Sequence, residues 1–407
     1  MRIEADVNIF RRSLGPVLAC VGRGPRNTAT KQITLETRNG RVFAYGQGTG
    51  VFVTSQLAAV TPMGVRETCS VCAKDFMRSL KAATGEKIKI ITTRQELTIR
   101  DDSGWISMRA SIVPVPLPPP AEGWSVPVVM PAMWLDDLST AMSWIGTEPF
   151  RPEFTFLKTM LRPDGYRTVA GDGGAFVVFD RRNDGANKRG VSFFIHRDQC
   201  RVLKSIAASL AAQEMVVRWS IHNPSKVSLL TESTSIRLWG HASPEYPDEQ
   251  KVMSAQPQWR CVYRPADWNL EFSGLCAAIQ SKDTNCIDGF RPFVRITLRS
   301  QEKVLLAKVD HPGRARAIRK LPLCHLDMPS EPSQLEDFLI DFSSLEKLME
   351  ATKHFQHVQL DRIAAGILRI SEGEIVCRAD ESIGGQEGQI LLIGVRQKPA
   401  QKLPVRF

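Results

Sequence analysis

The chain has 407 residues, of which 43% are hydrophobic and 24% charged, and this composition excludes a disordered or fibrous protein. No apolar run reaches the roughly 18 residues that a membrane-spanning helix needs. The N-terminal residues Met1-Arg2-Ile3-Glu4 are charged and are not followed by the apolar core of a secretory signal. We therefore expect a soluble, cytoplasmic protein of about two to four domains.

The charge balance is basic. Lys and Arg number 53 against 43 Asp and Glu, which gives a net charge of +10. Such an excess favours polyanionic partners. Surplus surface charge that keeps the protein in solution explains the same number, and composition alone does not choose between the two.

The nine cysteines are an odd, scattered set, which argues against a disulfide framework and favours a reducing compartment. Cys69 and Cys72 form the only C-x-x-C, and no second pair follows at zinc-site spacing. The segment is also predicted to be a strand, in which residues three apart point to opposite faces. The sequence predicts neither a metal site nor a cofactor.

The strongest signal is internal repetition. Six times, a short apolar strand leads into an amphipathic helix with apolar residues at i, i+3 and i+4. The six segments are Arg2–Gly15, Ser70–Ala83, Pro127–Met142, Ser192–Ala208, Arg260–Ile279 and Asp337–Phe355. We call each segment, with the strands that follow it, a repeat.

Strands with period-2 alternation follow the helices. Lys87–Thr93, Glu96–Arg100 and Trp105–Ser111 follow the second helix, and Met215–Ile221, Lys226–Thr231 and Ser235–His241 follow the fourth. One helix and about four strands in each repeat predict an α+β fold of antiparallel sheets with helices on one face.

Two breaks group the repeats into pairs. Val113–Pro120 is proline-rich and cannot continue a sheet, and a weaker break lies at Ser254–Pro257. We therefore predict three domains of two repeats each, over residues 1–120, 126–253 and 258–407.

Two helices carry cations at i, i+4 and i+7, which places three charges on the face opposite the apolar one. These cations are Lys74, Arg78 and Lys81 in the second repeat and Arg197, Arg201 and Lys204 in the fourth, and Arg12 lies at one of these phases in the first. A solvated face is the ordinary explanation of such a stripe. Its recurrence at one phase in related repeats favours a surface that faces phosphates without reading bases.

Catalytic motifs are missing from the sequence. It contains no G-x-x-x-x-G-K-[ST], no G-x-S-x-G and no H-E-x-x-H. Gly171-Asp172-Gly173-Gly174 joins two predicted strands and is predicted to be a hairpin turn. We predict no catalytic residues.

Three stretches resemble one family in order and spacing. Met1-Arg2-Ile3-Glu4 before an apolar helix, Arg167–Gly173 (RTVAGDG) and Tyr246-Pro247-Asp248 with Lys251-Val252 are similar to motifs of the bacterial DNA polymerase III beta subunit, the replicative sliding clamp. The resemblance covers nearly the whole chain, in pattern more than in identity.

The resemblance implies three tandem clamp domains and a head-to-tail homodimer closed into a ring, with the sheets outside and the helices around duplex DNA. It implies a non-catalytic processivity factor that tethers a DNA polymerase and meets a clamp loader. The cations named above would face the DNA, with Arg26 in a loop similar to a DNA-contacting loop of the family.

The resemblance also implies a cleft for partner peptides. By position it would use Gly171, Gly173, Gly174, Ala175, Phe176, Pro247, Lys251, Val252, Leu391, Ile393, Val395 and Arg396. Leu403–Phe407 resembles the family's last strand as well, but we favour Leu391–Arg396 because its apolar run is longer. The tail Lys398–Phe407 would then be an addition that could itself occupy a cleft. Gly174-Ala175-Phe176 departs from the family's His-Arg-Leu, which puts polar peptide contacts in question.

Two alternatives stay open. An accessory clamp would use the same fold to recruit repair, recombination or mobile-element enzymes. A nucleic-acid-processing enzyme would use acidic residues that the sequence places in turns and on helix flanks.

Overall fold

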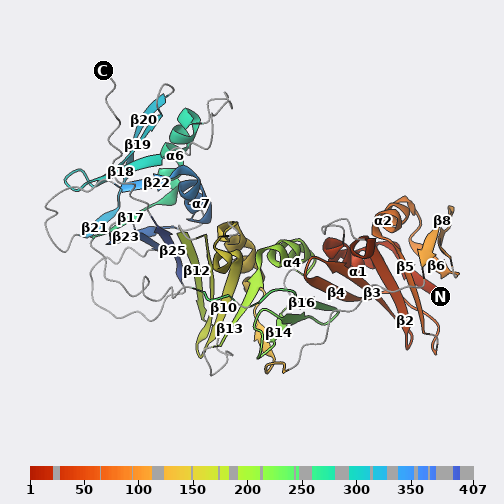
Figure 1. Cartoon of the computed structure of the whole chain (residues 1–407). Helices are drawn as coiled ribbons and strands as arrows, with labels where there is room; N and C mark the ends of the chain where they lie inside the picture. Colours follow the sequence, from red (N-terminus) through yellow and green to blue (C-terminus); the bar gives the residue numbers. More distant parts are fainter. Residues whose placement is uncertain are drawn as a thin grey trace, which may run out of the picture. The chain divides into compact units, whose positions relative to one another are not determined.

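One order of elements, a strand, a helix and three further strands, recurs six times in the described part of the chain (Figure 1). The computed structural model describes residues 1–407 except 22–27, 65, 94, 112–122, 148–149, 173–174, 183–190, 211–213, 243, 247–258, 280–292, 312–314, 328–337, 353–355, 365–366, 373–387 and 395–407. Each predicted strand-and-helix segment contains a helix where the periodicity placed one. The prediction of an α+β fold built from six repeats is confirmed.

The first three repeats begin at the N-terminus. The first consists of β1 (Arg2–Asp6), α1 (Val7–Cys20), β2 (Gln32–Arg38), β3 (Arg41–Gly48) and β4 (Val51–Leu57). The second consists of β5 (Glu67–Cys72), α2 (Ala73–Ala82), β6 (Lys87–Thr92), β7 (Glu96–Asp101) and β8 (Gly104–Ser111). The third consists of β9 (Val128–Met130), α3 (Met133–Ala141), β10 (Phe156–Arg162), β11 (Gly165–Gly171) and β12 (Ala175–Arg182).

The other three repeats follow the same order. The fourth consists of β13 (Val191–His196), α4 (Arg197–Leu210), β14 (Met215–Trp219), β15 (Val227–Leu230) and β16 (Thr234–Leu238). The fifth consists of β17 (Trp259–Tyr263), α6 (Pro265–Ile279), β18 (Phe293–Arg299), β19 (Val304–His311) and β20 (Ala315–Pro322), with β21 (His325–Asp327) after it. The sixth consists of β22 (Phe338–Asp341), α7 (Phe342–Thr352), β23 (Val358–Ala364), β24 (Ile367–Glu372) and β25 (Gly388–Gly394). Three short 3-10 helices, η1 (Thr28–Lys31), η2 (Met142–Trp144) and η3 (Pro152–Thr155), lie in connections.

The chain divides into two compact units. Unit 1 contains Met1–Met142, Phe156–Gly165 and Asn183–Glu245, and unit 2 contains Ser143–Thr155, Tyr166–Arg182 and Tyr246–Phe407. The division passes through the third repeat. The two predicted breaks, Val113–Pro120 and Ser254–Pro257, lie outside the described residues. The three domain boundaries therefore stay a prediction.

Unit 1 contains an antiparallel sheet with the strand order β1-β6-β7-β8-β5-β2-β3-β4-β16-β15-β14-β9. The last strand of the first repeat, β4, pairs with the last strand of the fourth, β16, from Val51↔Leu238 to Ser55↔Thr234. The buried hydroxyls of Ser55 and Thr234 lie 3.1 Å apart across this junction. Repeats distant in the sequence thus share one sheet.

Helix α1 packs closely on the sheet of unit 1. Asp6 caps it, because its carboxylate accepts from the N–H groups of Asn8 and Ile9 at 2.9 Å each. Gly46 lies under the helix, where a Cβ atom would stand 2.6 Å from Val21.

In β5, Cys69 is buried and Cys72 exposed, as the predicted strand requires.

In unit 2 the strands follow the order β11-β12-β25-β24-β23-β17-β21, and a separate sheet has the order β20-β19-β18-β22. The last strand of the third repeat, β12, pairs with the last strand of the sixth, β25. In both places, β4 with β16 and β12 with β25, the last strands of two repeats therefore pair with each other. Between the fifth repeat's helix and strands, the Trp268 indole N–H donates to the carbonyl of Pro322 at 3.0 Å.

No helix in the described part of the chain combines the length and the apolar composition that a membrane span requires.

Candidate nucleic-acid interface and partner cleft

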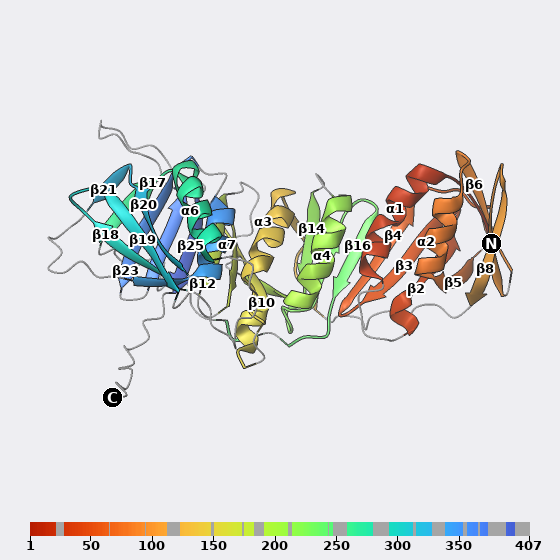
Figure 2. The same cartoon turned by 90° about the horizontal axis from the view of Figure 1, so that it is seen from above.

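The helices of unit 1 lie in a row over one face of its sheet, in the order α2, α1, α4 and α3 (Figure 2). Each buries its apolar stripe against the strands and turns its other side away from them. Because the predicted cations lie opposite the apolar stripes, this row carries most of the candidate DNA contacts.

Helix α2 exposes all three of its predicted cations. Phe76 and Leu80 are buried, while Lys74, Arg78 and Lys81 are exposed on the opposite side. The amphipathic spacing of the sequence therefore places the charges where the prediction put them.

In helix α1 the two neighbouring arginines have different surroundings. Arg12 is exposed, as predicted. Arg11 is half-buried, and its guanidinium donates to the carbonyls of Leu80 and Ala83, the latter at 3.3 Å. A cation at these carbonyls stabilises the C-terminal end of α2 and fixes it against α1.

Helix α4 exposes Arg201 and Lys204, and Arg197 is half-buried at its start. Arg201 makes an ion pair with Asp198 at 3.4 Å. Burial, followed by the neighbouring charge of Arg201, lowers the pKa of Arg197. On α3, by contrast, Asp136 is exposed. The cationic surface therefore extends over α2, α1 and α4 and ends before α3.

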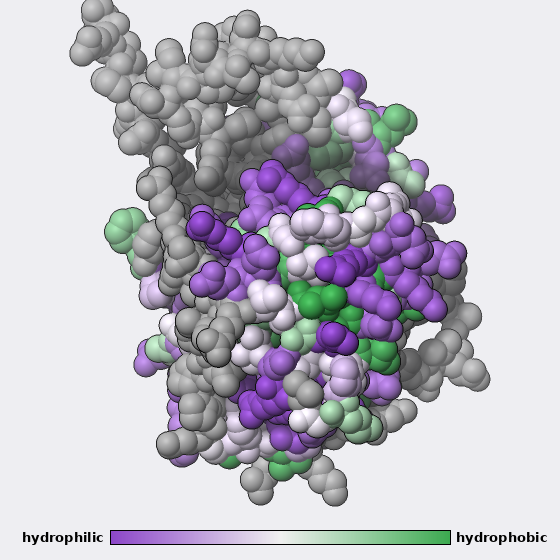
Figure 3. Space-filling model, turned by 90° about the vertical axis from the view of Figure 1, so that its right-hand side faces the viewer, coloured by the Kyte–Doolittle hydropathy of each residue, from purple (hydrophilic) through white to green (hydrophobic). Residues whose placement is uncertain are grey.

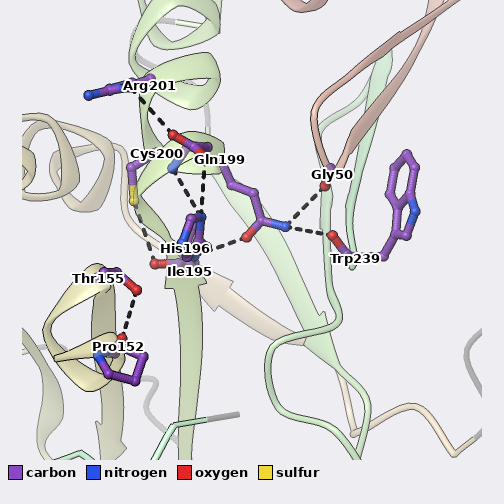
Figure 4. Close-up of polar contacts among 10 residues, drawn as sticks. Gly50, Pro152, Thr155, Ile195, His196, Gln199, Cys200, Arg201 and Trp239 are labelled. Atoms are coloured by element: carbon purple, nitrogen blue, oxygen red, sulfur yellow. Dashed lines mark hydrogen bonds and ion pairs between the residues drawn. The ribbon is translucent and has the colours of Figure 1, made fainter. Parts of the chain in front are cut away.

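A network at the start of α4 holds the helix on the β4–β16 junction (Figure 4). His196 is the N-cap: its Nδ1 accepts from the N–H of Asp198 at 3.3 Å. Gln199 completes a capping box, because its Oε1 accepts from the His196 N–H at 3.0 Å. The Gln199 Nε2 donates to the carbonyls of Gly50 and Trp239, at 3.0 Å each. One buried side chain thus joins α4 to both sides of the junction.

The ring of His196 stacks on that of His241, with centroids 3.8 Å apart, and Phe156 meets both rings edge-on. Burial and then His241 lower the pKa of His196 to about 4, and burial lowers that of His241. Both rings are therefore neutral near pH 7. A neutral ring leaves Nδ1 free to accept the capping hydrogen bond, which protonation of that nitrogen would prevent.

A substitution at Gly50 tests how much this junction contributes to stability. Its φ is +64°, and an added Cβ would lie 2.7 Å from the Trp239 carbonyl oxygen. We expect Gly50→Ala to lower the free energy of unfolding by about 2 kcal/mol, from backbone strain and displacement of the junction.

Urea denaturation checks the Gly50 prediction, and Gly64→Ala is the matched control. Gly64 also has a positive φ, +82°, but nothing lies within 4 Å of its added Cβ. Equal losses in the two variants would show that the close approach at Gly50 contributes nothing.

In unit 2 the structure brings together part of the predicted partner cleft. Gly171 ends β11, Ala175 and Phe176 begin β12, and Leu391 and Ile393 lie in β25. The register pairs Ala175 with Ile393 and Phe176 with Leu392. Of the predicted strand Leu391–Arg396, Leu391–Gly394 lie in β25, and Val395 and Arg396 lie outside the described residues.

Other predicted site residues lie outside the described residues. They are Arg26, Gly173, Gly174, Pro247, Lys251, Val252, Val395, Arg396 and the tail Lys398–Phe407.

The loop before β10 contributes contacts beside Gly171 that the sequence did not indicate. The Gly146 N–H donates to the carbonyls of Gly171 at 3.0 Å and Phe154 at 2.8 Å. The Phe154 ring meets Tyr246 edge-on, with centroids 6.5 Å apart. Phe150, in the same loop, is 93% exposed. The loop that contacts Gly171 therefore also carries an exposed aromatic side chain.

No group of three or more His, Cys, Asp and Glu side chains among the described residues could hold a metal ion. Asp101, an acidic residue at the end of β7, accepts from the N–H groups of Ser103, Gly104 and Thr84 and from the Ser103 hydroxyl. These hydrogen bonds, led by that of the Ser103 hydroxyl, lower the pKa of Asp101 to about 2.

No protein-family model matches the sequence, and no curated protein matches it. Solved structures match 98% of this chain and 100% of their own. The beta subunit from DNA polymerase of Streptococcus pyogenes has a TM-score of 0.79 at 13% identity. The DNA polymerase III beta subunit from Thermotoga maritima has 0.76 at 12%, and that from Pseudomonas aeruginosa 0.79 at 13%. The chain therefore has the fold of the DNA polymerase III beta subunit, the sliding clamp.

Proposed function

We propose that this protein is a DNA sliding clamp. Two protomers close into a ring around duplex DNA in the cytoplasm, and the ring tethers a DNA polymerase to its template without catalysing a reaction. One observation carries the proposal: a six-repeat clamp fold turns the cations of three adjacent helices away from its sheet. Exposed Lys and Arg side chains bind phosphates irrespective of sequence, which lets a ring slide.

The pairing rule of the repeats supports ring closure. In β4–β16 and β12–β25, the last strand of an odd-numbered repeat pairs with that of an even-numbered one. The strands left over are β20, in the fifth repeat, and β8, in the second. β20 is the last strand of its sheet, and among the described residues β8 pairs with β5 at Ser111 and Ala110 alone. We infer that β20 of one protomer pairs with β8 of the other, head to tail.

Exposed apolar side chains lie on these two strands and beside them. Trp105 and Ile106 on β8 are 67% and 38% exposed, and Ile318 on β20 is 59% exposed. Leu270, on the helix that packs on β20, is 77% exposed. Figure 3, which faces the side of unit 1 with β6 and β8, shows hydrophobic residues gathered among hydrophilic ones. Apolar side chains on a strand edge suit burial against a partner.

The helices beside these strands carry opposite charges. Helix α2, which packs beside β8, exposes Lys74 and Arg78, whereas α6 exposes Asp267. Glu271 of α6 already pairs with Arg319 of β20 at 3.8 Å. Helices α1 and α4 flank the β4–β16 junction in the same way that α6 and α2 of two protomers would flank β20–β8. Opposite charges there favour the head-to-tail orientation.

We also propose that peptides of the polymerase and of a clamp loader bind beside the β12–β25 junction. The pairing of Ala175 with Ile393 and the exposed ring of Phe150 support an apolar peptide site there.

Retention on circular DNA tests the proposed function. During a long incubation, dimers that dissociate and reassociate close around nicked circles. We expect the protein to remain with the circles through gel filtration in 0.5 M salt and to leave them once they are cut. Charge-only binding would instead fall steeply with salt on both DNA forms. Equal loss from circles and linear DNA would contradict the proposal.

A further inference from the structure

The basic charge of the chain is concentrated in one short segment. Residues 291–320 contain nine Lys and Arg against two Asp and Glu, a net charge of +7, and the rest of the chain carries +3. The nine are Arg291, Arg295, Arg299, Lys303, Lys308, Arg314, Arg316, Arg319 and Lys320. This segment forms β18, β19 and β20, and none of its cations belongs to the helical surface described above.

Strand alternation separates the two faces of this sheet. Val294, Ile296 and Leu298 of β18 are buried, as are Leu305, Ala307 and Val309 of β19. Helix α6 packs on β19 and β20. The alternate residues lie on the other face, where the register also places the half-buried Thr297, Val304 and Leu306. We call its cation-bearing part the cationic sheet face: Arg295, Arg299, Lys308, Ile318 and Lys320. All of these are exposed except Lys308, which is half-buried.

The strand register brings like charges together on this face. Arg295 lies directly opposite Lys308, and Lys308 lies opposite Ile318. Like charges in directly opposite positions destabilise a sheet. Lys320 makes an exposed ion pair with Glu302 at 2.8 Å. The register therefore places cations of three neighbouring strands on one face.

We propose that the cationic sheet face binds the phosphate backbone of duplex DNA at a second site, separate from the DNA-facing helices. Arg295 and Arg299 lie about 13 Å apart along β18, the axial length that about four phosphates of one strand occupy. Arginine guanidinium groups bind phosphate in bidentate geometry. Guanidinium and ammonium groups bind phosphates whatever base is attached, so the contact is independent of sequence.

The choice of DNA over an acidic protein rests on the proposed function, which keeps this face close to DNA. Strand pairing between protomers uses the edge of β20 and would bury Ile318 at the border of the cationic sheet face, whose four cations stay accessible. The second contact would hold duplex that lies outside the ring.

A short duplex isolates this contact, because a ring cannot be retained topologically on a 20-base-pair linear fragment. The test variant of the full chain carries Arg295→Gln, Arg299→Gln, Lys308→Gln and Lys320→Gln. Fluorescence anisotropy with the labelled duplex measures the dissociation constant over a salt series. We expect it to rise about 30-fold or more at low salt, and the salt slope to fall by about 3.

The matched control removes four other exposed strand cations, with Arg41→Gln, Lys89→Gln, Arg100→Gln and Arg237→Gln. It changes the net charge equally, and we expect a change of less than threefold. Equal effects of the two variants would overturn the proposal. So would tighter binding of polyglutamate of matched charge than of the duplex, since the partner would then be an acidic protein.

Retention on circles separates this inference from the proposed function. The unmodified protein could fail to stay on circles while the four glutamines at the cationic sheet face still weaken short-duplex binding. That result would support the sheet contact and contradict the ring. If the variant is retained on circles and binds the short duplex with the affinity of the unmodified protein, the result supports the ring and contradicts the sheet contact.

Discussion

Trp105→Asp is expected to convert the protein from a dimer to a monomer and to abolish its retention on circular DNA. Trp105 is two-thirds exposed on β8, so the substitution costs the folded protomer little. At the proposed interface its ring would be buried, and losing that burial costs about 2 kcal/mol. A ring of two protomers contains two such interfaces. The dissociation constant should therefore rise roughly 1000-fold.

Light scattering at micromolar concentration checks this expectation. The unmodified protein should give about twice 45.4 kDa, and Trp105→Asp about the protomer mass. Ile221→Asp is the control, because Ile221 is also about two-thirds exposed in unit 1 but lies away from β8. A Trp105→Asp protein that stays dimeric would rule out the β8 interface.

Mixing two variants distinguishes head-to-tail from symmetric pairing. Leu270→Asp alters the opposite side of the interface and should also give monomers. In a head-to-tail ring, an equimolar mixture of Trp105→Asp and Leu270→Asp has one unmodified interface and one with both changes. The mixture should form dimers that do not stay on circles. A mixture that remains monomeric would argue against the head-to-tail order.

The fold was predictable from the sequence because the apolar residues of each repeat recur at the spacing of its helix and of its strands. Phe76 and Leu80 at i and i+4, against Lys74 and Arg78 on the other side, define both the helix and its exposed face. The strands of the second repeat follow from alternation, and the structure places β6 and β7 within one residue of the predicted bounds.

Contacts between repeats were not predictable in this way. Gln199 is an ordinary polar residue in the sequence, and its role depends on carbonyls at Gly50 and Trp239 that only folding brings near. Likewise, spacing at i, i+4 and i+7 identifies cations on one face of a helix, whereas the cations of β18–β20 alternate with apolar residues at period 2. Their common face became visible only once the register placed Arg295 opposite Lys308.

The stacked histidines make the stability of unit 1 depend on pH. His196 has a pKa of about 4 in the folded protein, below the ordinary value of about 6.5 that it regains on unfolding. Between these values the unfolded chain binds a proton that the folded chain does not. The stabilisation is therefore complete above about pH 7 and is lost as the pH falls from 6.5 toward 4. Because solvent partly screens the ring, we expect about 1–2 kcal/mol.

His196→Asn isolates this contribution, because asparagine also caps a helix and does not titrate. Losing the ring contacts with His241 and Phe156 adds a cost that is similar at every pH. The unmodified protein should therefore lose more stability than the variant between pH 7.5 and 5, as followed by urea denaturation. His222→Asn is the control, since His222 is exposed and lies in the turn after β14. Parallel stability profiles for the unmodified protein and His196→Asn would mean that the capping nitrogen is not coupled to protonation. A steeper profile for the unmodified protein alone would assign the acid sensitivity of unit 1 to the contact that holds α4, with its exposed cations, on the β4–β16 junction.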